Sequence, residues 1–151
     1  MHVDLRFADE RSCSYADIDP INDLLRQLSN TAAEIDFNYL VRVAGHSRLL
    51  LARFSGRIVG MGTLIPVFQP TGASGLIEDV VVGDMIRGFG LGRRITEELI
   101  EEAKRLNLRK VELTSRPERV AANKLYLSLG FVLQLIKSNP PRNFYGLDLT
   151  H

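Results

Sequence analysis

The stretch that decides the fold reads Val82-Gly83-Asp84-Met85-Ile86-Arg87-Gly88-Phe89-Gly90-Leu91-Gly92-Arg93-Arg94. It follows a run of valines typical of a buried strand and leads into an amphipathic helix. Glycines let the backbone adopt positive φ and approach a ligand closely. A helix start presents unpaired N–H groups, and Arg87, Arg93 and Arg94 add positive charge there. The stretch therefore indicates a site for an anion such as a phosphate, although a purely structural glycine-rich turn fits the same pattern.

Two common phosphate-binding motifs do not account for this stretch. The P-loop pattern G-x-x-x-x-G-K-[ST] is absent from the chain. The spacing Gly88-x-Gly90-x-Gly92 also differs from the G-x-G-x-x-G of dinucleotide-binding folds, and its strand is not the first of a βαβ repeat.

Hydrophobic periodicity around the stretch predicts the element order β, α, α, β, β, β, α, β, α, β, β. Asp19 is expected to cap the first helix with Pro20 at its first position, and Glu101 and Arg105 to pair on the third. A turn-rich loop is expected at 70–75, and the valines at 80–82 are expected to be buried on both faces of their strand. The predicted strands are 3–7, 49–54, 58–68, 76–82, 110–114, 131–136 and 144–149. The predicted helices are 20–28, 32–44, 91–106 and 121–129, although Phe37, Tyr39 and Val41 in the second also fit a strand.

Length and composition place the chain among ordinary globular proteins. Its 151 residues are 45% hydrophobic and 25% charged, which is enough for one domain spanning 1–151 with a core of its own. The net charge of +1 argues against a nucleic-acid binder, and no apolar run is long enough to cross a membrane. His2, His46 and His151 are scattered, so no metal site is expected. The single Cys13 excludes an internal disulfide, and without signal-peptide features we expect a cytoplasmic protein.

The charge is unevenly distributed along the chain. Residues 1–36 hold eight acidic and three basic residues, a net of −5, and the remainder has a net of +6. The larger part is suited to an anionic ligand and the first part to a cationic one, although a solvated acidic surface also explains the latter.

Two motifs together identify a family resemblance. Arg87-Gly88-Phe89-Gly90-Leu91-Gly92 matches the Q/R-x-x-G-x-G/A motif of the GCN5-related N-acetyltransferase (GNAT) family at every fixed position. Ala122-Asn123-Lys124-Leu125-Tyr126-Leu127-Ser128-Leu129-Gly130-Phe131 resembles the family's later A-N-x-x-L-Y-x-x-x-G-F motif, and residues 77–82 resemble its fourth strand. The resemblance covers residues 76–131 closely. It implies a mixed α/β (α+β) fold, with a central mixed sheet of about six to seven strands flanked by about four helices.

The resemblance also implies acetyl-CoA as cofactor and a place for it. In such enzymes the fourth and fifth strands splay apart, and acetyl-CoA lies in the wedge between them. Strand residues would pair with the pantetheine arm, N–H groups from Gly88 to Arg93 would hold the pyrophosphate, and Arg116 or Arg119 would reach the 3′-phosphate. The implied cofactor-binding residues are Val80, Val81, Val82, Arg87, Gly88, Phe89, Gly90, Leu91, Gly92, Arg93, Asn123 and Tyr126.

Acetyl transfer to an amine needs a base, a proton donor for the departing thiolate and a donor to the oxyanion. Tyr126 is the expected proton donor, and a backbone N–H of the splayed strand is the expected oxyanion donor. Glu78 is the first candidate base and Asp79 the second, on opposite faces if the strand is regular. Some relatives carry an acid where this chain has Thr114, which leaves the base open. We expect direct attack with no acyl-enzyme, and Cys13 as a buried small side chain.

The sequence thus predicts an acetyl-CoA-dependent N-acetyltransferase acting on a primary amine in a ternary complex. The acceptor is a small molecule or a protein, and residues 17–40 and 66–74 are expected to line its pocket. A non-catalytic acyl-CoA-binding regulator and a protein-interaction module that kept only the fold are the alternatives. By analogy with relatives, a homodimer using the final strands is expected, with no nucleic-acid or membrane partner.

Overall fold

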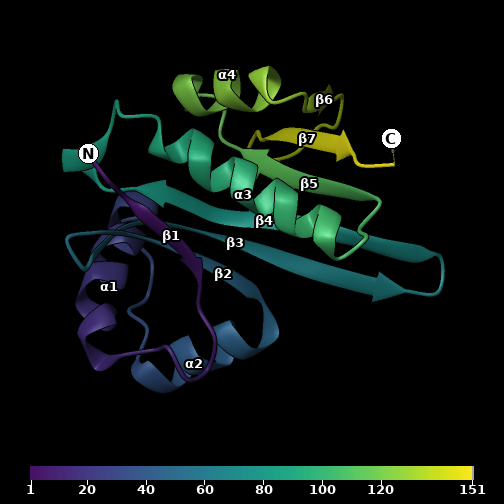
Figure 1. Ribbon diagram of the computed structural model, residues 1–151. Coiled ribbons are helices and arrows are strands. Elements are labelled where there is room, and N and C mark those ends of the chain that lie inside the picture. Colours follow the sequence, from purple (N-terminus) through teal and green to yellow (C-terminus); the bar gives the residue numbers. More distant parts are fainter. Residues whose placement is uncertain (151) are drawn as a thin grey trace.

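One seven-stranded sheet forms the centre of the protein in this computed structural model, which describes residues 1–150 (Figure 1). The strand order is β1-β2-β3-β4-β5-β7-β6, and β4 pairs with β5 in parallel while every other neighbouring pair is antiparallel. This confirms the predicted mixed α/β class. The strands are β1 Asp4–Phe7, β2 Arg48–Phe54, β3 Arg57–Gln69, β4 Gly72–Val82, β5 Lys110–Ser115, β6 Val132–Gln134 and β7 Asn143–Asp148.

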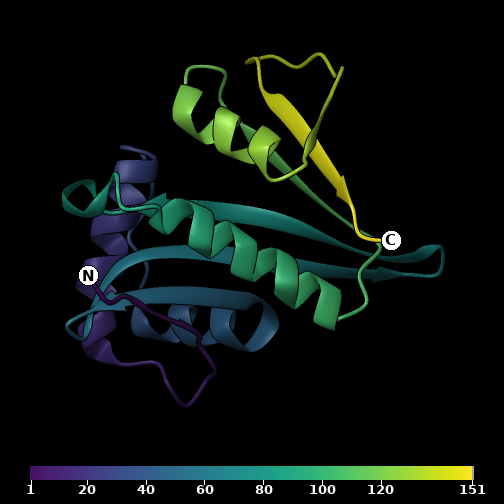
Figure 2. The same ribbon diagram turned by 45° about the horizontal axis from the view of Figure 1, so that its top comes forward.

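Four α-helices cover the two faces of the sheet, as Figure 2 shows. Because side chains alternate along β2, Leu49 and Leu51 pack in one apolar cluster with α1 and α2, while Leu50 and Ala52 pack in another with α3. The second cluster is the larger and continues to Tyr126 on α4. The helices are α1 Ile18–Leu28, α2 Phe37–His46, α3 Leu91–Arg105 and α4 Val120–Ser128.

The start of α1 differs from the prediction. A 3-10 turn, Tyr15–Asp17, precedes the helix, and Ser14 and Asp17 form a capping box around that turn. Asp19 lies inside α1 and is not its cap, so the predicted cap is wrong. Asp17 is buried and pairs with Arg53 on β2 at 2.9 Å, so its carboxylate ties the helix start to the sheet.

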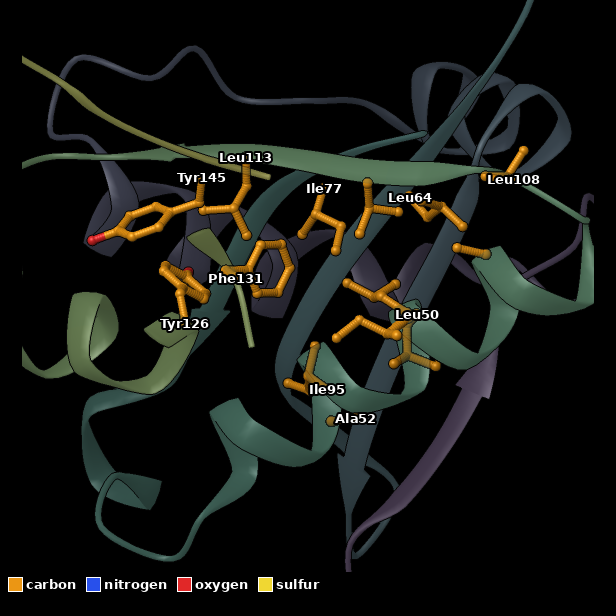
Figure 3. Packing of buried hydrophobic residues seen from close by; sticks show 14 of the residues in the cluster. Leu50, Ala52, Leu64, Ile77, Ile95, Leu108, Leu113, Tyr126, Phe131 and Tyr145 are labelled. Atoms are coloured by element: carbon orange, nitrogen blue, oxygen red, sulfur yellow. The ribbon is translucent and has the colours of Figure 1, made fainter. Parts of the chain in front are cut away.

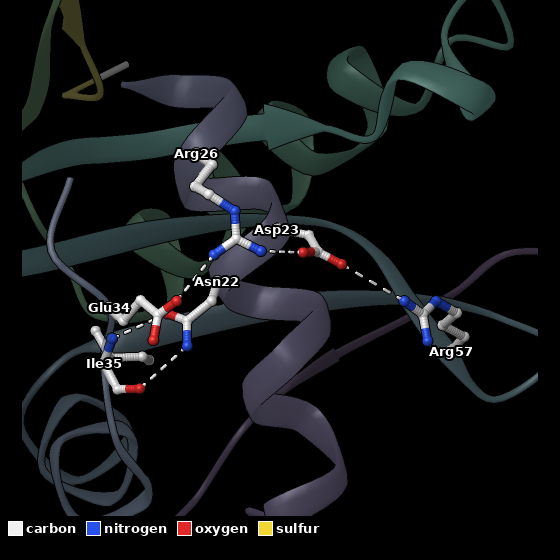
Figure 4. A network of polar contacts seen from close by, with 6 residues as sticks. All are labelled: Asn22, Asp23, Arg26, Glu34, Ile35 and Arg57. Carbon is white, nitrogen blue, oxygen red and sulfur yellow. Dashed lines mark hydrogen bonds and ion pairs between the residues drawn. The ribbon is translucent and has the colours of Figure 1, made fainter. Parts of the chain in front are cut away.

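The second helix begins at Phe37, five residues later than predicted, with Asp36 as its N-cap. The reason is a competing contact to the preceding segment: the Asn22 side chain accepts from the Ile35 N–H at 2.9 Å and donates to the Ile35 carbonyl at 3.1 Å (Figure 4). Arg26, which lies on α1 together with Asn22, also pairs with Glu34. These bonds hold the segment before α2 in a non-helical conformation against α1.

Where a loop was predicted at 70–75, the structure has a tight turn at Pro70-Thr71 and β4 already begins at Gly72. A Cβ on Gly75 would lie 2.8 Å from Leu64 and 2.9 Å from Leu108, so this glycine permits close packing within the sheet region. Residues 66–74 therefore form the far end of the β3–β4 hairpin (Figure 1).

A β-bulge interrupts β4 at Asp79. Thr63 pairs with Glu78 and Met61 with Val81, so two residues of β4 stand opposite Gly62. Asp79 has a φ of 53°, a left-handed conformation that Asp tolerates better than most residues. The β4–β5 pairing extends only through Leu76 and Glu112, and beyond it the two strands separate, which opens the sheet above the bulge.

A smaller difference concerns the ion pairs on α3. Arg105 pairs with Glu98 and Glu102, whereas Glu101 pairs with Lys104, so the predicted Glu101–Arg105 pair is wrong.

Within residues 1–150 no helix is both long and apolar enough to cross a membrane. The same residues contain no group of three or more His, Cys, Asp or Glu that could hold a metal ion, and His151 lies outside them.

Candidate active site

Two adjoining cavities open where β4 and β5 separate. The glycine cavity, about 560 Å³, lies between the end of β4, the turn before α3, and α4. The carboxylate cavity, about 340 Å³, lies between the bulged part of β4 and the end of β5. Five residues line both: Leu28, Val80, Arg116, Arg119 and Tyr126.

The glycine cavity is bordered by backbone N–H groups that are free to donate hydrogen bonds. Gly88 and Gly90 have positive φ values of 87° and 76°, a conformation that favours glycine. A Cβ at either position would meet nothing within 4 Å, so the backbone conformation, and not a lack of space, is the reason for glycine there. The N–H groups from Gly88 to Arg93 donate no hydrogen bond within residues 1–150. They converge at the start of α3, where an anion is favoured by both the free donors and the helix dipole.

The strand that borders the glycine cavity is less buried than predicted. Val81 is buried, but Val80 and Val82 are half-buried because they line the glycine cavity. The expectation of a strand end buried on both faces is therefore wrong. These are the two residues whose backbone the sequence resemblance assigns to the pantetheine arm.

The arginines of the motif divide between two roles. Arg87 and Arg93 line the glycine cavity, where they pair with Asp84 at 2.9 Å and with Glu97 at 3.3 Å. Arg94 instead donates to the carbonyl of Val3 at 3.1 Å and does not line the cavity, which contradicts the expectation that it faces an anion there.

Two residues predicted to bind the cofactor do not line the glycine cavity. Phe89 is 64% exposed on the outside of the turn. The Asn123 side chain donates to the carbonyls of Arg116 and Pro117 at 3.1 and 3.3 Å and accepts from the Tyr145 hydroxyl at 2.9 Å. All its hydrogen bonds within the described residues are internal, so in this structure it holds the loop that carries Arg116 and Arg119.

The bulge brings both acids into the carboxylate cavity. Glu78 and Asp79 both line it, whereas a regular strand would point them to opposite faces as predicted. Burial raises the pKa of Glu78 and the charge of Asp79 raises it further, and burial raises the pKa of Asp79. Neither carboxylate forms an ion pair within residues 1–150. Carboxylates with raised pKa values in a cleft are suited to proton transfer.

Tyr126 lies where the two cavities meet. Its ring packs against Phe131 and Tyr145, with centroids 5.9 and 5.7 Å apart (Figure 3). Burial raises the pKa of Tyr126 more than the nearby charge of Arg119 lowers it, so the hydroxyl keeps its proton at neutral pH. The hydroxyl has no hydrogen-bond partner within residues 1–150 and is available to a ligand in either cavity.

Some expected residues lie elsewhere, and others were missed. Residues 66–74 line neither cavity, and of 17–40 only the end of α1 does, at 27–29. Cys13 is half-buried against the cluster under α1, donates to the Asp9 carbonyl at 3.3 Å and lines neither cavity. Ser115 and Arg142 line the carboxylate cavity without having been predicted, because neither belongs to a motif.

The sequence matches the model of the acetyltransferase (GNAT) family over residues 9–131. The chain therefore belongs to the GNAT family. This defines its class as that of the acetyltransferases.

Individual relatives agree with the family. Glucosamine 6-phosphate N-acetyltransferase 1 of rice (Oryza sativa subsp. japonica) is 30% identical over 110 residues, which are 70% of this chain and 65% of the relative. The chain thus spans just under two thirds of the length of this curated relative. Among solved structures, yncA of Salmonella typhimurium with its cofactor acetyl-CoA superposes with a TM-score of 0.81 at 20% identity, covering 100% of this chain and 96% of that one. Arabidopsis thaliana glucosamine-6-phosphate N-acetyltransferase gives 0.72 at 24% identity, covering 91% and 97%.

The residues of the glycine cavity fit acetyl-CoA. A pyrophosphate needs several donors and positive charge, and the free N–H groups at the start of α3 with Arg87 and Arg93 supply both. A pantetheine arm needs an apolar wall beside an open strand edge, which Val80 and Val82 supply where β4 has left β5.

Proposed function

We propose that this protein transfers the acetyl group of acetyl-CoA to a primary amine by direct attack in a ternary complex. The observation that carries the proposal is the position of Tyr126 at the junction of a cavity built for an anionic cofactor and a cavity lined by two carboxylates. When bound, acetyl-CoA supplies an activated acetyl thioester. The protein then has to bind it, deprotonate the amine and provide a proton for the sulfur.

Each task falls to a group already described. The N–H groups from Gly88 to Arg93 hold the pyrophosphate, and Val80 and Val82 border the pantetheine arm. Arg116 and Arg119, which form no ion pair within residues 1–150, are placed to reach the 3′-phosphate.

Glu78 takes the proton of the amine, directly or through water, with Asp79 as the second candidate. Both pKa values are raised, so each carboxylate is a better base than one with the ordinary carboxyl pKa. Tyr126 supplies the proton for the sulfur, since its raised pKa keeps the hydroxyl protonated. Cys13 lies outside both cavities, which favours direct transfer over an acyl-enzyme.

An acceptor panel tests the proposal. The full chain is incubated with acetyl-CoA and with polyamines, amino acids, amino sugars, lysine peptides and glucosamine 6-phosphate, the last because the rice relative is named for it. Acetylated products are measured by mass spectrometry, with Tyr126→Phe as the comparison. Turnover of an amine that falls steeply in Tyr126→Phe supports the proposal. Binding of acetyl-CoA without turnover of any class of amine would contradict it and favour an acyl-CoA-binding regulator.

A further inference from the structure

The proposed reaction leaves two groups of the carboxylate cavity unexplained. The first is Ser115, at the end of β5. It is 3% exposed, and its Oγ is the one buried side-chain polar atom in residues 1–150 that has no hydrogen-bond partner. Buried polar groups without partners are rare and destabilise a fold, so each needs a reason. Ser115 lines the carboxylate cavity, where a bound molecule would provide the missing partner.

The second group is Arg142, directly before β7. Asn143, its neighbour, pairs with Ser115 in the β5–β7 ladder, which places Arg142 at the same end of the sheet as Ser115. Arg142 is exposed, forms no hydrogen bond or ion pair within residues 1–150, and lines the carboxylate cavity but not the glycine cavity. Its positive charge therefore belongs to the carboxylate cavity alone.

The charges of this cavity do not neutralise one another. Within residues 1–150 no arginine forms an ion pair with Glu78 or Asp79, and burial and the charge of Asp79 raise the pKa of Glu78. One wall is thus acidic and another, with Arg142 and Arg116, is basic. A pocket of about 340 Å³ with separated opposite charges is suited to a small molecule that carries both signs.

We propose that the acceptor is a small zwitterion, a primary amine that also carries an oxyanion, either phosphate or carboxylate. The amine faces Glu78 and Asp79, Arg142 binds the oxyanion, and Ser115 Oγ donates a hydrogen bond to a polar group of the acceptor. This inference rests on the proposed function and names the class of substrate for the same site. A guanidinium binds phosphate or carboxylate with paired N–H groups, so Arg142 accommodates either.

Matched acceptors test the proposal. One pair is an amino sugar 6-phosphate against the same amino sugar, and the other is an α-amino acid against its carboxamide. We expect kcat/KM to be at least about tenfold higher for one anionic member, as charge-assisted hydrogen bonds are worth about 1.5–3 kcal/mol. The pair that responds identifies phosphate or carboxylate. Equal kcat/KM within both pairs would overturn the zwitterion and leave the acetyltransferase intact, whereas no acetylation of any amine would overturn both.

Arg142→Gln is the first variant. It should raise KM for the anionic acceptor about tenfold or more, leave the neutral member of the pair unchanged, and recover partly in Arg142→Lys. Arg42→Gln is the matched control, because Arg42 is an exposed arginine on α2 that lines neither cavity and forms no ion pair within the described residues. An equal loss for both members of the pair would overturn the role of Arg142.

Ser115→Ala separates a binding role from a structural one. Since the hydroxyl has no partner in the folded protein, its removal should leave Tm unchanged or raise it. The same variant should raise KM for the anionic acceptor several-fold. A lowered Tm with unchanged KM would show that the hydroxyl serves the fold and would overturn its assignment to the acceptor.

Discussion

The glycine cavity and the carboxylate cavity share Tyr126 but are built in different ways. The first takes its donors from one continuous stretch, 87–93, whose conformation is set by glycines and by the start of α3. The second collects side chains from the end of α1, the bulge in β4, the end of β5 and the residue before β7. Backbone N–H groups recognise an anion whatever the side chains are, whereas the second cavity depends on which side chains the fold brings together. Local sequence therefore specifies the glycine cavity, and tertiary structure specifies the carboxylate cavity.

Tyr126→Phe tests the point at which the two cavities meet and should have the largest effect. Removal of the proton donor should lower kcat by about 10²–10⁴-fold, the usual contribution of general acid catalysis. Tm and the affinity for acetyl-CoA should change little, because the hydroxyl has no protein partner within residues 1–150. Steady-state kinetics with a titration of CoA provides the measurement. A kcat within threefold of the wild type would remove Tyr126 from the reaction.

Glu78→Gln tests the acidic wall and should lower kcat about a hundredfold or more if this carboxylate is the base. The acid limb of the wild-type pH–rate profile should lie above the ordinary carboxyl pKa of 4.5. Asp79→Asn is the control, and it should lower the midpoint of that limb by removing the charge that raises the pKa of Glu78. A larger loss in Asp79→Asn than in Glu78→Gln would exchange the two roles.

The same carboxyl makes a prediction about stability. A raised pKa in the folded state means that folding favours the protonated acid, so this stabilisation is present below pH 4.5 and is lost as the pH rises through the raised pKa. Glu78→Gln should therefore have a higher Tm than the wild type at pH 7, with a difference that shrinks on acidification. Thermal melts between pH 4 and 7 measure it, and a Tm deficit of the variant at neutral pH would contradict it.

Gly90→Val tests the backbone N–H groups that border the glycine cavity. At a φ of 76° a β-branched residue is strained by about 1–2 kcal/mol, and the turn that positions the N–H groups should distort. The rise in Tm on addition of CoA should be largely lost. Gly56→Val is the matched control, with a φ of 81°, open space around its Cβ and a position in the β2–β3 turn outside both cavities. Unchanged stabilisation by CoA in Gly90→Val would contradict the placement of the pyrophosphate.

What could be predicted from sequence follows the same division. The element order follows from periodicity, and the glycine cavity follows from two local motifs. Gly88 and Gly90 adopt the positive φ for which glycine is needed. Asp79 could not be placed correctly, because its bulge depends on the register between β3 and β4. Arg94 carries the same charge as Arg93 and adjoins it, yet it reaches Val3 just before β1, since helical geometry turns successive residues by about 100°. Ser115 and Arg142 line one cavity only because the β5–β7 ladder brings their segments together, which no local pattern encodes.

Asn123 belongs to a local motif but is held by tertiary hydrogen bonds, so it tests which of the two determines its role. Its variant should have the smallest effect. The motif resemblance assigns it to the cofactor, whereas its hydrogen bonds tie the loop of Arg116 and Pro117 to Tyr145. If it positions that loop, Asn123→Ala should lower stability by about 1–2 kcal/mol and raise KM for both substrates only a few-fold.

Tyr145→Phe is the control for Asn123, as it removes one of the same bonds from the other side. In a double-mutant cycle the two losses of stability should fall short of additivity by about 0.5–1 kcal/mol, as expected for a shared contact. A cofactor contact predicts a different pattern. Asn123→Ala would then lower the affinity for CoA alone, with unchanged stability and no coupling to Tyr145. Asn123 would in that case contact the cofactor, as its motif implies.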